Sequence, residues 1–168
     1  MVNEEVKPIG IDSTGFELLT EAVRNMLNSY PALPFGTTIR FEQLDERSGI
    51  AFSADNGSLI ISEKQSVTGK ITRTCSYPFF VVYRASGDLE NQKIAIQEFL
   101  DGIGKWICGE AVEANGDAYV LKPYPELSDG RKITRVTRMN SYGLTPGENG
   151  VQDWLMPCTV EYMHVYYK

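Results

Sequence analysis

Apolar side chains recur at steps of three and four along residues 13–30. This spacing places them on one side of a helix, which predicts an amphipathic helix that packs on another element. Thr14 and Glu17 form a T-x-x-E capping box at its start, and Pro31 ends it, because the residue before a proline resists helical geometry. The expected buried stripe consists of Phe16, Leu19, Val23, Met26, Leu27 and Tyr30.

A second helical pattern spans residues 88–107. Asp88 is its expected N-cap, and Gly109 is its expected C-terminal stop. Gly102 and Gly104 lower the helix propensity by ~1 kcal/mol each relative to alanine, unless they allow the helix to pack closely on a sheet. The expected buried stripe consists of Leu89, Ile96, Phe99, Leu100, Ile103, Trp106 and Ile107.

The remaining patterned segments alternate between apolar and polar positions or are rich in β-branched and aromatic residues, which predicts strands. They cover residues 37–45, 50–52, 59–62, 70–86, 130–144 and 152–168. Asp55-Asn56-Gly57 predicts a turn between two of them, since Asn-Gly readily takes the positive φ angles of hairpin turns. Pro78 lacks an amide donor, so we expect a bulge or a sheet edge there.

The closing segment, QDWLMPCTVEYMHVYYK, predicts a strand with apolar side chains on both faces. One face carries Cys158, Val160, Tyr162, His164 and Tyr166, and the other carries Thr159, Glu161, Met163, Val165 and Tyr167. We expect a helix on one face. On the other face the aromatic side chains either pack within the chain or contact another subunit, since large exposed apolar patches are uncommon on monomers. The turn-rich residues 145–150 are a candidate contact loop.

The expected elements are a helix, three or four strands, a second helix and two strands. Because the strands are grouped, this order predicts an α+β fold: a largely antiparallel or mixed sheet with two main helices packed on one face. At 168 residues the chain is long enough to bury a core as one domain. We expect a single domain over residues 13–168 and a flexible lead-in over residues 1–12, where charge, proline and glycine show no period.

The net charge of −6 disfavours nucleic acid as the main partner, because phosphate contacts require clustered Lys and Arg. The densest basic segment consists of Arg131, Lys132, Arg135 and Arg138. No segment approaches the ~20 apolar residues of a membrane-spanning helix, and the N-terminus has no apolar signal region. These features predict a cytosolic protein without a membrane partner.

No residue pattern identifies a catalytic, cofactor-binding or metal site. Phosphate-loop, dinucleotide and nucleophile-elbow motifs are absent, and His164 alone is too few for a His-rich zinc site. Cys75, Cys108 and Cys158 fall in apolar segments, where buried thiols are expected, although a Cys–His pair stays open. The weaker candidates are the DGIGK segment 101–105 for phosphate and the acid pairs Glu4-Glu5 and Asp45-Glu46 for acid–base chemistry. We therefore expect no enzyme activity, no cofactor and no metal.

Phrases along most of the chain resemble minor structural proteins of long-tailed phages and prophages. They include Tyr77-Pro78-Phe79, QEFLD at residues 97–101 and Asp129-Gly130-Arg131, within a similar order of segments from Leu18 to Tyr166. The chain looks like a tail-terminator (tail-completion) or head–tail joining protein of a bacteriophage virion. The resemblance implies an α/β sandwich that assembles as a ring, a hexamer in the assembled tail, and contacts tail-tube and connector proteins.

The resemblance also implies a non-enzymatic role in virion assembly, first in the bacterial cytoplasm and then at the tail or head–tail interface of the virion. A ring subunit requires complementary edges and loops for heterologous contacts, and no catalytic residue. Two other hypotheses remain open. One is a small-molecule or nucleotide-binding regulatory α+β domain with polar groups near Tyr162 and His164. The other is a cysteine-dependent hydrolase built on Cys75 or Cys158.

Overall fold

The computed structural model describes residues 7–86 and 90–168. It contains 43% strand and 21% helix with mostly antiparallel pairing, which confirms the α+β fold class. The helices are α1 (Ser13–Asn28) and α2 (Glu90–Ile107). The strands are β1 (Gly10–Ile11), β2 (Arg40–Phe41), β3 (Gly49–Ala54), β4 (Leu59–Gln65), β5 (Lys70–Ser86), β6 (Val112–Ala114), β7 (Asp117–Tyr119), β8 (Arg131–Arg138), β9 (Tyr142–Gly143) and β10 (Val151–Tyr167).

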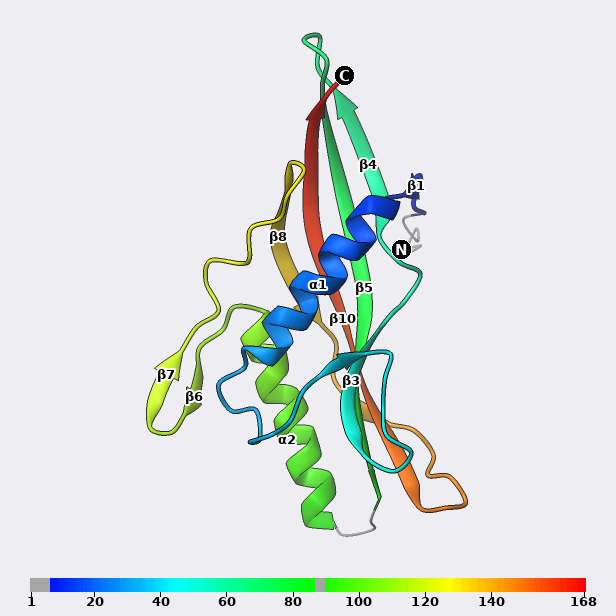
Figure 1. Cartoon of the computed structure of the whole chain (residues 1–168), viewed down its shortest axis with the longest axis vertical. Helices are drawn as coiled ribbons and strands as arrows, with labels where there is room; N and C mark the ends of the chain where they lie inside the picture. Colours follow the sequence, from blue (N-terminus) through cyan, green and yellow to red (C-terminus); the bar gives the residue numbers. More distant parts are fainter. Residues whose placement is uncertain (1–6, 87–89) are drawn as a thin grey trace, which may run out of the picture.

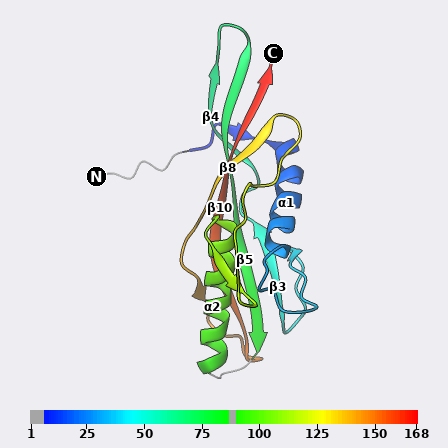
Figure 2. The ribbon, with the colours of Figure 1, turned by 90° about the vertical axis from the view of Figure 1, so that its left-hand side faces the viewer.

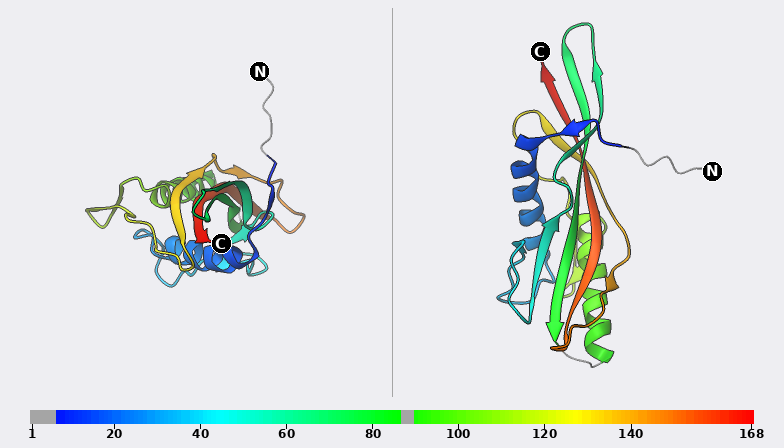
Figure 3. Two further views of the ribbon diagram at one scale, coloured as in Figure 1. Left: turned by 90° about the horizontal axis from the view of Figure 1, so that it is seen from above. Right: turned by 90° about the vertical axis from the view of Figure 1, so that its right-hand side faces the viewer.

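Two 17-residue strands, β5 and β10, form the centre of the sheet and pair antiparallel along their whole length. The main sheet has the order β1-β4-β5-β10-β8. β3 pairs with the second half of β5 and β9 with the first part of β10, so both lie at the end of the central strands away from β4 and β8. β6 and β7 form a separate two-stranded sheet. In Figure 1 the two long strands run through the middle of the molecule. Seen from above in Figure 3, the sheet curves around α1.

Both helices pack on the same face of the central strand pair. The buried side chains of that face are Ile71, Cys75, Tyr77, Phe79 and Val81 of β5 and Trp154, Met156, Cys158, Val160 and Tyr162 of β10. Phe16 of α1 lies against the ring of Tyr77, with centroids 6.0 Å apart, and Phe99 of α2 lies 5.6 Å from Tyr83. The predicted arrangement of two helices on one face is thus confirmed.

Helix α2 lies close to the sheet because Gly104 has no side chain. A Cβ at this position would stand 2.9 Å from Met156 Sδ and would also clash with the Arg138 side chain. The expectation that a glycine of this helix allows close packing is therefore correct. Gly109 follows the helix with a φ of 80°, as expected for a C-terminal stop.

Each central strand carries a proline at the point where its outer neighbour is interrupted. Pro78 of β5 faces the gap between β3 and β4, where its carbonyl accepts the Asp55 N–H at 2.9 Å. Pro157 of β10 faces the gap between β8 and β9 and accepts the Met139 N–H at 2.9 Å. Because N and C=O of one residue in an antiparallel strand point to the same neighbour, neither proline removes a ladder bond. Pro78 thus lies inside a central strand, at a gap instead of the expected bulge or edge.

The turn at residues 55–57 forms, but it does not make a hairpin. Asn56 and Gly57 have φ angles of 69° and 74°, yet β3 and β4 pair with β5 and not with each other. The strand expected over residues 37–45 is reduced to β2, which pairs parallel with β3. The sequence-based expectation also lacks the β6–β7 hairpin, although Asn115-Gly116 is a strong hairpin signal.

The end of the expected lead-in takes part in the fold. β1 pairs with β4, and Asp12 is only 5% exposed. Asp12, and not Thr14, caps α1, because its Oδ1 accepts the Gly15 N–H at 3.1 Å. The other lead-in residues 1–6, the expected cap Asp88 and the expected stripe residue Leu89 lie outside the described residues.

The β4–β5 hairpin and the end of β10 project beyond α1 (Figure 2). We call this three-stranded projection, residues 62–73 and 164–168, the arm. Val67 at its turn is fully exposed, and Lys64, Lys70 and Lys168 make the tip basic. The arm therefore presents a surface separate from the body of the molecule.

Candidate functional site

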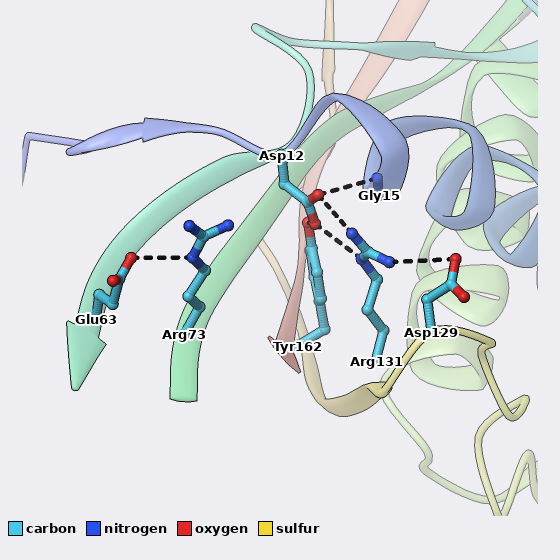
Figure 4. A network of polar contacts seen from close by, with 7 residues as sticks. All are labelled: Asp12, Gly15, Glu63, Arg73, Asp129, Arg131 and Tyr162. Carbon is cyan, nitrogen blue, oxygen red and sulfur yellow. Dashed lines mark hydrogen bonds and ion pairs between the residues drawn. The ribbon is translucent and has the colours of Figure 1, made fainter. Parts of the chain in front are cut away.

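Asp12 lies at the N-terminus of α1, where a carboxylate accepts unpaired backbone N–H groups and interacts favourably with the helix dipole. Pairing of β1 with β4 fixes its backbone, since the Asp12 N–H donates to the Ser58 carbonyl at 2.9 Å. Its side chain points toward Arg131 at the start of β8 and Tyr162 of β10 (Figure 4). Three segments that are distant in sequence therefore meet at one carboxylate.

The Asp12 carboxylate accepts four hydrogen bonds. Arg131 donates two of them, Nε to Oδ2 at 3.0 Å and Nη2 to Oδ1 at 2.7 Å. Tyr162 donates its hydroxyl to Oδ2 at 2.7 Å, and the helix-capping bond from Gly15 is the fourth. Arg131 is 6% exposed and Tyr162 is fully buried. We call Asp12, Arg131 and Tyr162 the Asp12 cluster.

The Asp12 cluster holds each group in its ordinary ionisation state. Burial acts to raise the pKa of Asp12, but hydrogen bonds from Arg131, Tyr162 and Gly15, together with the Arg131 charge, outweigh it and lower the pKa to about 2. Burial, and also the bond to Asp12, raises the pKa of the Tyr162 hydroxyl. None of the three groups has a pKa near neutrality, as an efficient general acid or base requires. The arrangement favours a structural role.

His164 continues this face of β10 toward the arm and is the cross-strand partner of Arg131. Its ring lies 4.9 Å from that of Tyr166, and the Arg73 guanidinium lies 5.0 Å from the same tyrosine ring. Burial and the Arg131 charge lower the pKa of His164. Its Nδ1 is buried without a hydrogen-bond partner among the described residues. His164 is thus a residue of the closing strand β10, in the segment where the sequence predicts a strand.

The arginines of the basic strand β8 are paired with acids. Arg135 Nη2 lies 2.8 Å from Glu161 Oε1, and Arg138 Nη2 lies 2.9 Å from Asp101 Oδ1. Arg131 is bound in the Asp12 cluster. These pairs leave less positive charge for phosphate groups than the sequence alone suggests, in line with the acidic balance of the chain.

All three cysteines are free thiols in surroundings that disfavour the thiolate. Burial raises the pKa of Cys75 to about 11, and the negative charge of Asp12 adds to the effect. Burial also raises the pKa of Cys108 and that of Cys158. The thiolate is the nucleophilic form, so these environments argue against the hydrolase hypothesis.

The weaker sequence candidates do not converge on one site. Residues 101–105 lie within α2, where their backbone amides belong to the helix, and Asp101 pairs with Lys105 at 3.3 Å. Asp45 and Glu46 are exposed in the segment before β3, and Glu4-Glu5 lie outside the described residues. In the described part of the chain, no three His, Cys, Asp or Glu side chains are grouped to hold a metal ion. Neither α1 nor α2 has the length and apolar character needed to cross a membrane.

The face of β5 and β10 opposite the helices carries an apolar strip that we call the open face: Pro78, Phe80, Val82, Leu155 and Pro157. Phe80 is the cross-strand partner of Pro157, and Val82 is the partner of Leu155. All five side chains are half-buried, and neither α1 nor α2 lies on them. At one end of the strip Arg84 and Asp153 form an ion pair at 2.8 Å.

A groove lies between the segment 122–127 and the start of β8, residues 131–133, and we call it the 122–133 groove. Its volume is about 870 Å³, and Tyr124, Leu127 and Ile133 provide much of its apolar lining. The Tyr124 hydroxyl donates to the Ile107 carbonyl at 3.1 Å, which fixes this segment against the end of α2. The groove is therefore part of the folded body.

Sequence reasoning missed the Asp12 cluster, because Asp12 was assigned to the lead-in and Arg131 to a basic segment. One local signal was present: an aspartate directly before a predicted helix is a preferred N-cap. No local signal identifies Arg131 as its partner, since that contact depends on the tertiary fold.

No protein-family model matches this chain, and no curated protein is similar enough in sequence to count as a relative. The fold defines an α+β protein with one helix-covered sheet face and one open face.

Proposed function

We propose that this chain is a non-enzymatic virion assembly protein of a phage or prophage. It acts as a tail terminator or head–tail joining subunit that oligomerises into a ring at the tail end. The observation that carries the proposal is the open face, whose apolar strip has no helix on it while the opposite face of the same strands is buried under two. Covering this strip with another subunit removes apolar area from water, which is worth about 25 cal/mol per Å².

The distribution of surfaces supports a ring. The open face, the arm and the 122–133 groove occupy different parts of the molecule, so contacts between them are heterologous, and heterologous contacts form a ring when the rotation between neighbouring subunits closes. The net charge of −6 keeps free subunits soluble before assembly. In this role the chain works in the bacterial cytoplasm during assembly, then in the virion, where its ring contacts tail-tube and connector proteins.

The alternative, a small-molecule or nucleotide-binding regulatory domain, would use polar groups converging around Tyr162 and His164. These groups do converge, but their hydrogen bonds are directed at one another inside a nearly water-free cluster. Because the hydrogen bonds of the Asp12 cluster are made within the protein, the cluster supports the assembly proposal over the alternative. The atom that the alternative would use is His164 Nδ1, which is buried without a partner among the described residues. Thermal unfolding with metabolites and nucleotides compares the two, since a ligand that binds the folded chain raises its melting temperature.

Electron microscopy of tails made without this protein tests the proposed function. We expect tails of abnormal length or tails without heads, and the intact chain supplied in trans should restore normal particles. Phe80→Asp, on the open face, should fail to restore them. Thr74→Asp, at an exposed position on the same side of β5, is the matched control and should succeed. Normal tails and normal head attachment without the protein would overturn the proposal.

A further inference from the structure

Phe35 is 107% exposed, and among the described residues it is the largest apolar side chain that is fully exposed. It lies in a turn closed by a 3.0 Å hydrogen bond from Thr37 N–H to the Pro34 carbonyl. Gly36 has a φ of 78°, as the third position of a type II turn requires. The turn holds the aromatic ring out in water, where nothing in its own chain buries it.

The loop that carries Phe35 is fastened at its base. Asn28, the last residue of α1, binds both backbone groups of Ile39: Nδ2 donates to the carbonyl at 2.9 Å, and Oδ1 accepts the N–H at 2.8 Å. Ile39 is fully buried, and Leu33 packs against the core. A loop fixed in this way loses little conformational freedom on binding, which suits an anchor residue at an interface.

The 122–133 groove has the size and chemistry to receive such an anchor. At about 870 Å³ it falls in the range of sites that enclose a small molecule, so it has room for one aromatic side chain. Tyr124, Leu127 and Ile133 supply apolar contacts to a phenyl ring. Aromatic anchors in well-packed pockets carry much of the binding energy of protein interfaces.

The charges around the groove and around Phe35 are complementary. Lys122 and Lys132 line the groove together with one acid, Glu126, so it carries an excess of positive charge. The Phe35 turn lies beside residues 40–47, RFEQLDER, where the three acids Glu42, Asp45 and Glu46 outnumber the two arginines; Gly36 of the turn, Arg40 and Asp45 border the same depression. Opposite charges on the two surfaces favour their approach and fix their register.

Charge complementarity also excludes Val67 at the tip of the arm, the second fully exposed apolar side chain in the described part of the chain. Val67 is 106% exposed, but Lys64 and Lys70 flank it and Lys168 lies against the same turn. These lysines would meet Lys122 and Lys132 with like charge. Charge therefore selects the Phe35 turn, and not the arm tip, for the groove.

We propose that Phe35 of one subunit inserts into the 122–133 groove of a neighbouring copy of this chain. Both surfaces are present on every copy at different places, so the contact is heterologous and repeats around a ring. The inference rests on the proposed function and deepens it by naming a contact between ring neighbours. One anchor does not supply the ~1,000 Å² of a stable interface, and the open face provides further area.

Cysteine cross-linking tests this contact directly. Phe35→Cys and Leu127→Cys variants are purified, mixed at high concentration and oxidised. We expect a mixed disulfide dimer, with the joined peptides identified by mass spectrometry. The matched control mixes Val67→Cys, which is equally exposed, with Leu127→Cys and should give no dimer above background. Absence of the mixed disulfide, or an equal yield in the control, would overturn the contact.

A second measurement uses no new cysteine. Because Phe35 is fully exposed, Phe35→Ser leaves the fold intact, and we expect it to weaken self-association by roughly 30-fold, as for a loss of one interface hot spot. Val67→Ser should leave self-association unchanged, and sedimentation at several concentrations measures both. Equal self-association of Phe35→Ser and the unmodified chain contradicts the proposal.

The cross-linking and microscopy experiments can refute the contact and the proposed function independently. A mixed disulfide together with normal tails in the absence of the protein retains the contact and removes the virion role. Defective tails without a mixed disulfide retain the role and remove the contact.

Discussion

Asp12 and Arg131 form a buried ion pair with two hydrogen bonds across 119 residues of sequence. The two side chains are 5% and 4% exposed, so each charge is almost completely removed from water. The pair fastens the start of α1 to the start of β8, and the Tyr162 hydroxyl adds the C-terminal strand. A buried charge of this kind depends on its partner, because desolvation without pairing costs several kcal/mol.

Arg131→Met is expected to lower the free energy of unfolding by about 3–5 kcal/mol, because it leaves the Asp12 carboxylate buried without its cation. Urea denaturation followed by circular dichroism measures the loss. Arg135→Met is the matched control on the same strand; its pair with Glu161 is largely exposed and screened by solvent, so the expected loss is much smaller. Equal losses for the two variants would contradict the structural role of the Asp12 cluster.

The lowered pKa of Asp12 makes stability in acid depend on this residue. The pKa is about 2 in the folded protein against an ordinary value of 3.8, so the folded state favours the ionised form. The ionised carboxylate therefore contributes stability that is fully present above about pH 4 and is lost as the pH falls through about 2. The size of this contribution is ~2 kcal/mol.

Asp12→Asn removes this titration. We expect the variant to be less stable than the unmodified chain at neutral pH and to lose stability less steeply below about pH 4. Urea denaturation at a series of pH values measures both slopes. Asp129→Asn, which changes an exposed carboxylate 3.9 Å from the same arginine, is the control and should keep the slope of the unmodified chain. Parallel curves for Asp12→Asn and the unmodified chain would refute the linkage.

The cysteines provide a test of the hydrolase hypothesis. Cys75 and Cys158 are buried with raised pKa values, so we expect neither to react with a thiol reagent at neutral pH while the protein is folded. Cys108 is half-buried and should react slowly, and all three should react at once in denaturant. In the Cys108→Ser variant the slow labelling of the folded protein should disappear, which assigns that labelling to Cys108. Fast labelling of Cys75 or Cys158 in the folded protein would revive the hydrolase hypothesis.

The helices and the central strands follow from the sequence because their signals are local. The apolar stripe of residues 16–30 and the alternation of the closing segment each fix a period, and one buried face follows from each. Pairing partners are not local. Asn56-Gly57 adopts the expected turn geometry, but its two flanking strands both pair with β5, whose 17 residues accommodate the two ladders one after the other.

The Asp12 cluster shows why a polar site was harder to predict than the fold. Its members come from residues 12, 131 and 162, and each has an ordinary local explanation as cap, basic residue or sheet aromatic. Only the folded sheet brings them within hydrogen-bond distance. For the open face, the sequence predicts only a closing strand with apolar side chains on both faces; the strip itself lies on β5 and at Leu155 and Pro157, outside the positions 158–167 assigned to those faces.

Gly104 tests how closely α2 packs on the sheet. Helix propensity alone predicts that Gly104→Ala stabilises the protein by ~1 kcal/mol. Packing predicts the opposite, because the new Cβ would stand 2.9 Å from Met156 Sδ and would meet the Arg138 side chain. Overpacking costs about 1–3 kcal/mol, so we expect a net loss of stability in urea denaturation. Gln97→Ala, on the exposed side of α2, is the control and should change stability by less than about 0.5 kcal/mol. A stabilised Gly104→Ala would mean that α2 lies farther from β10 than the structure shows.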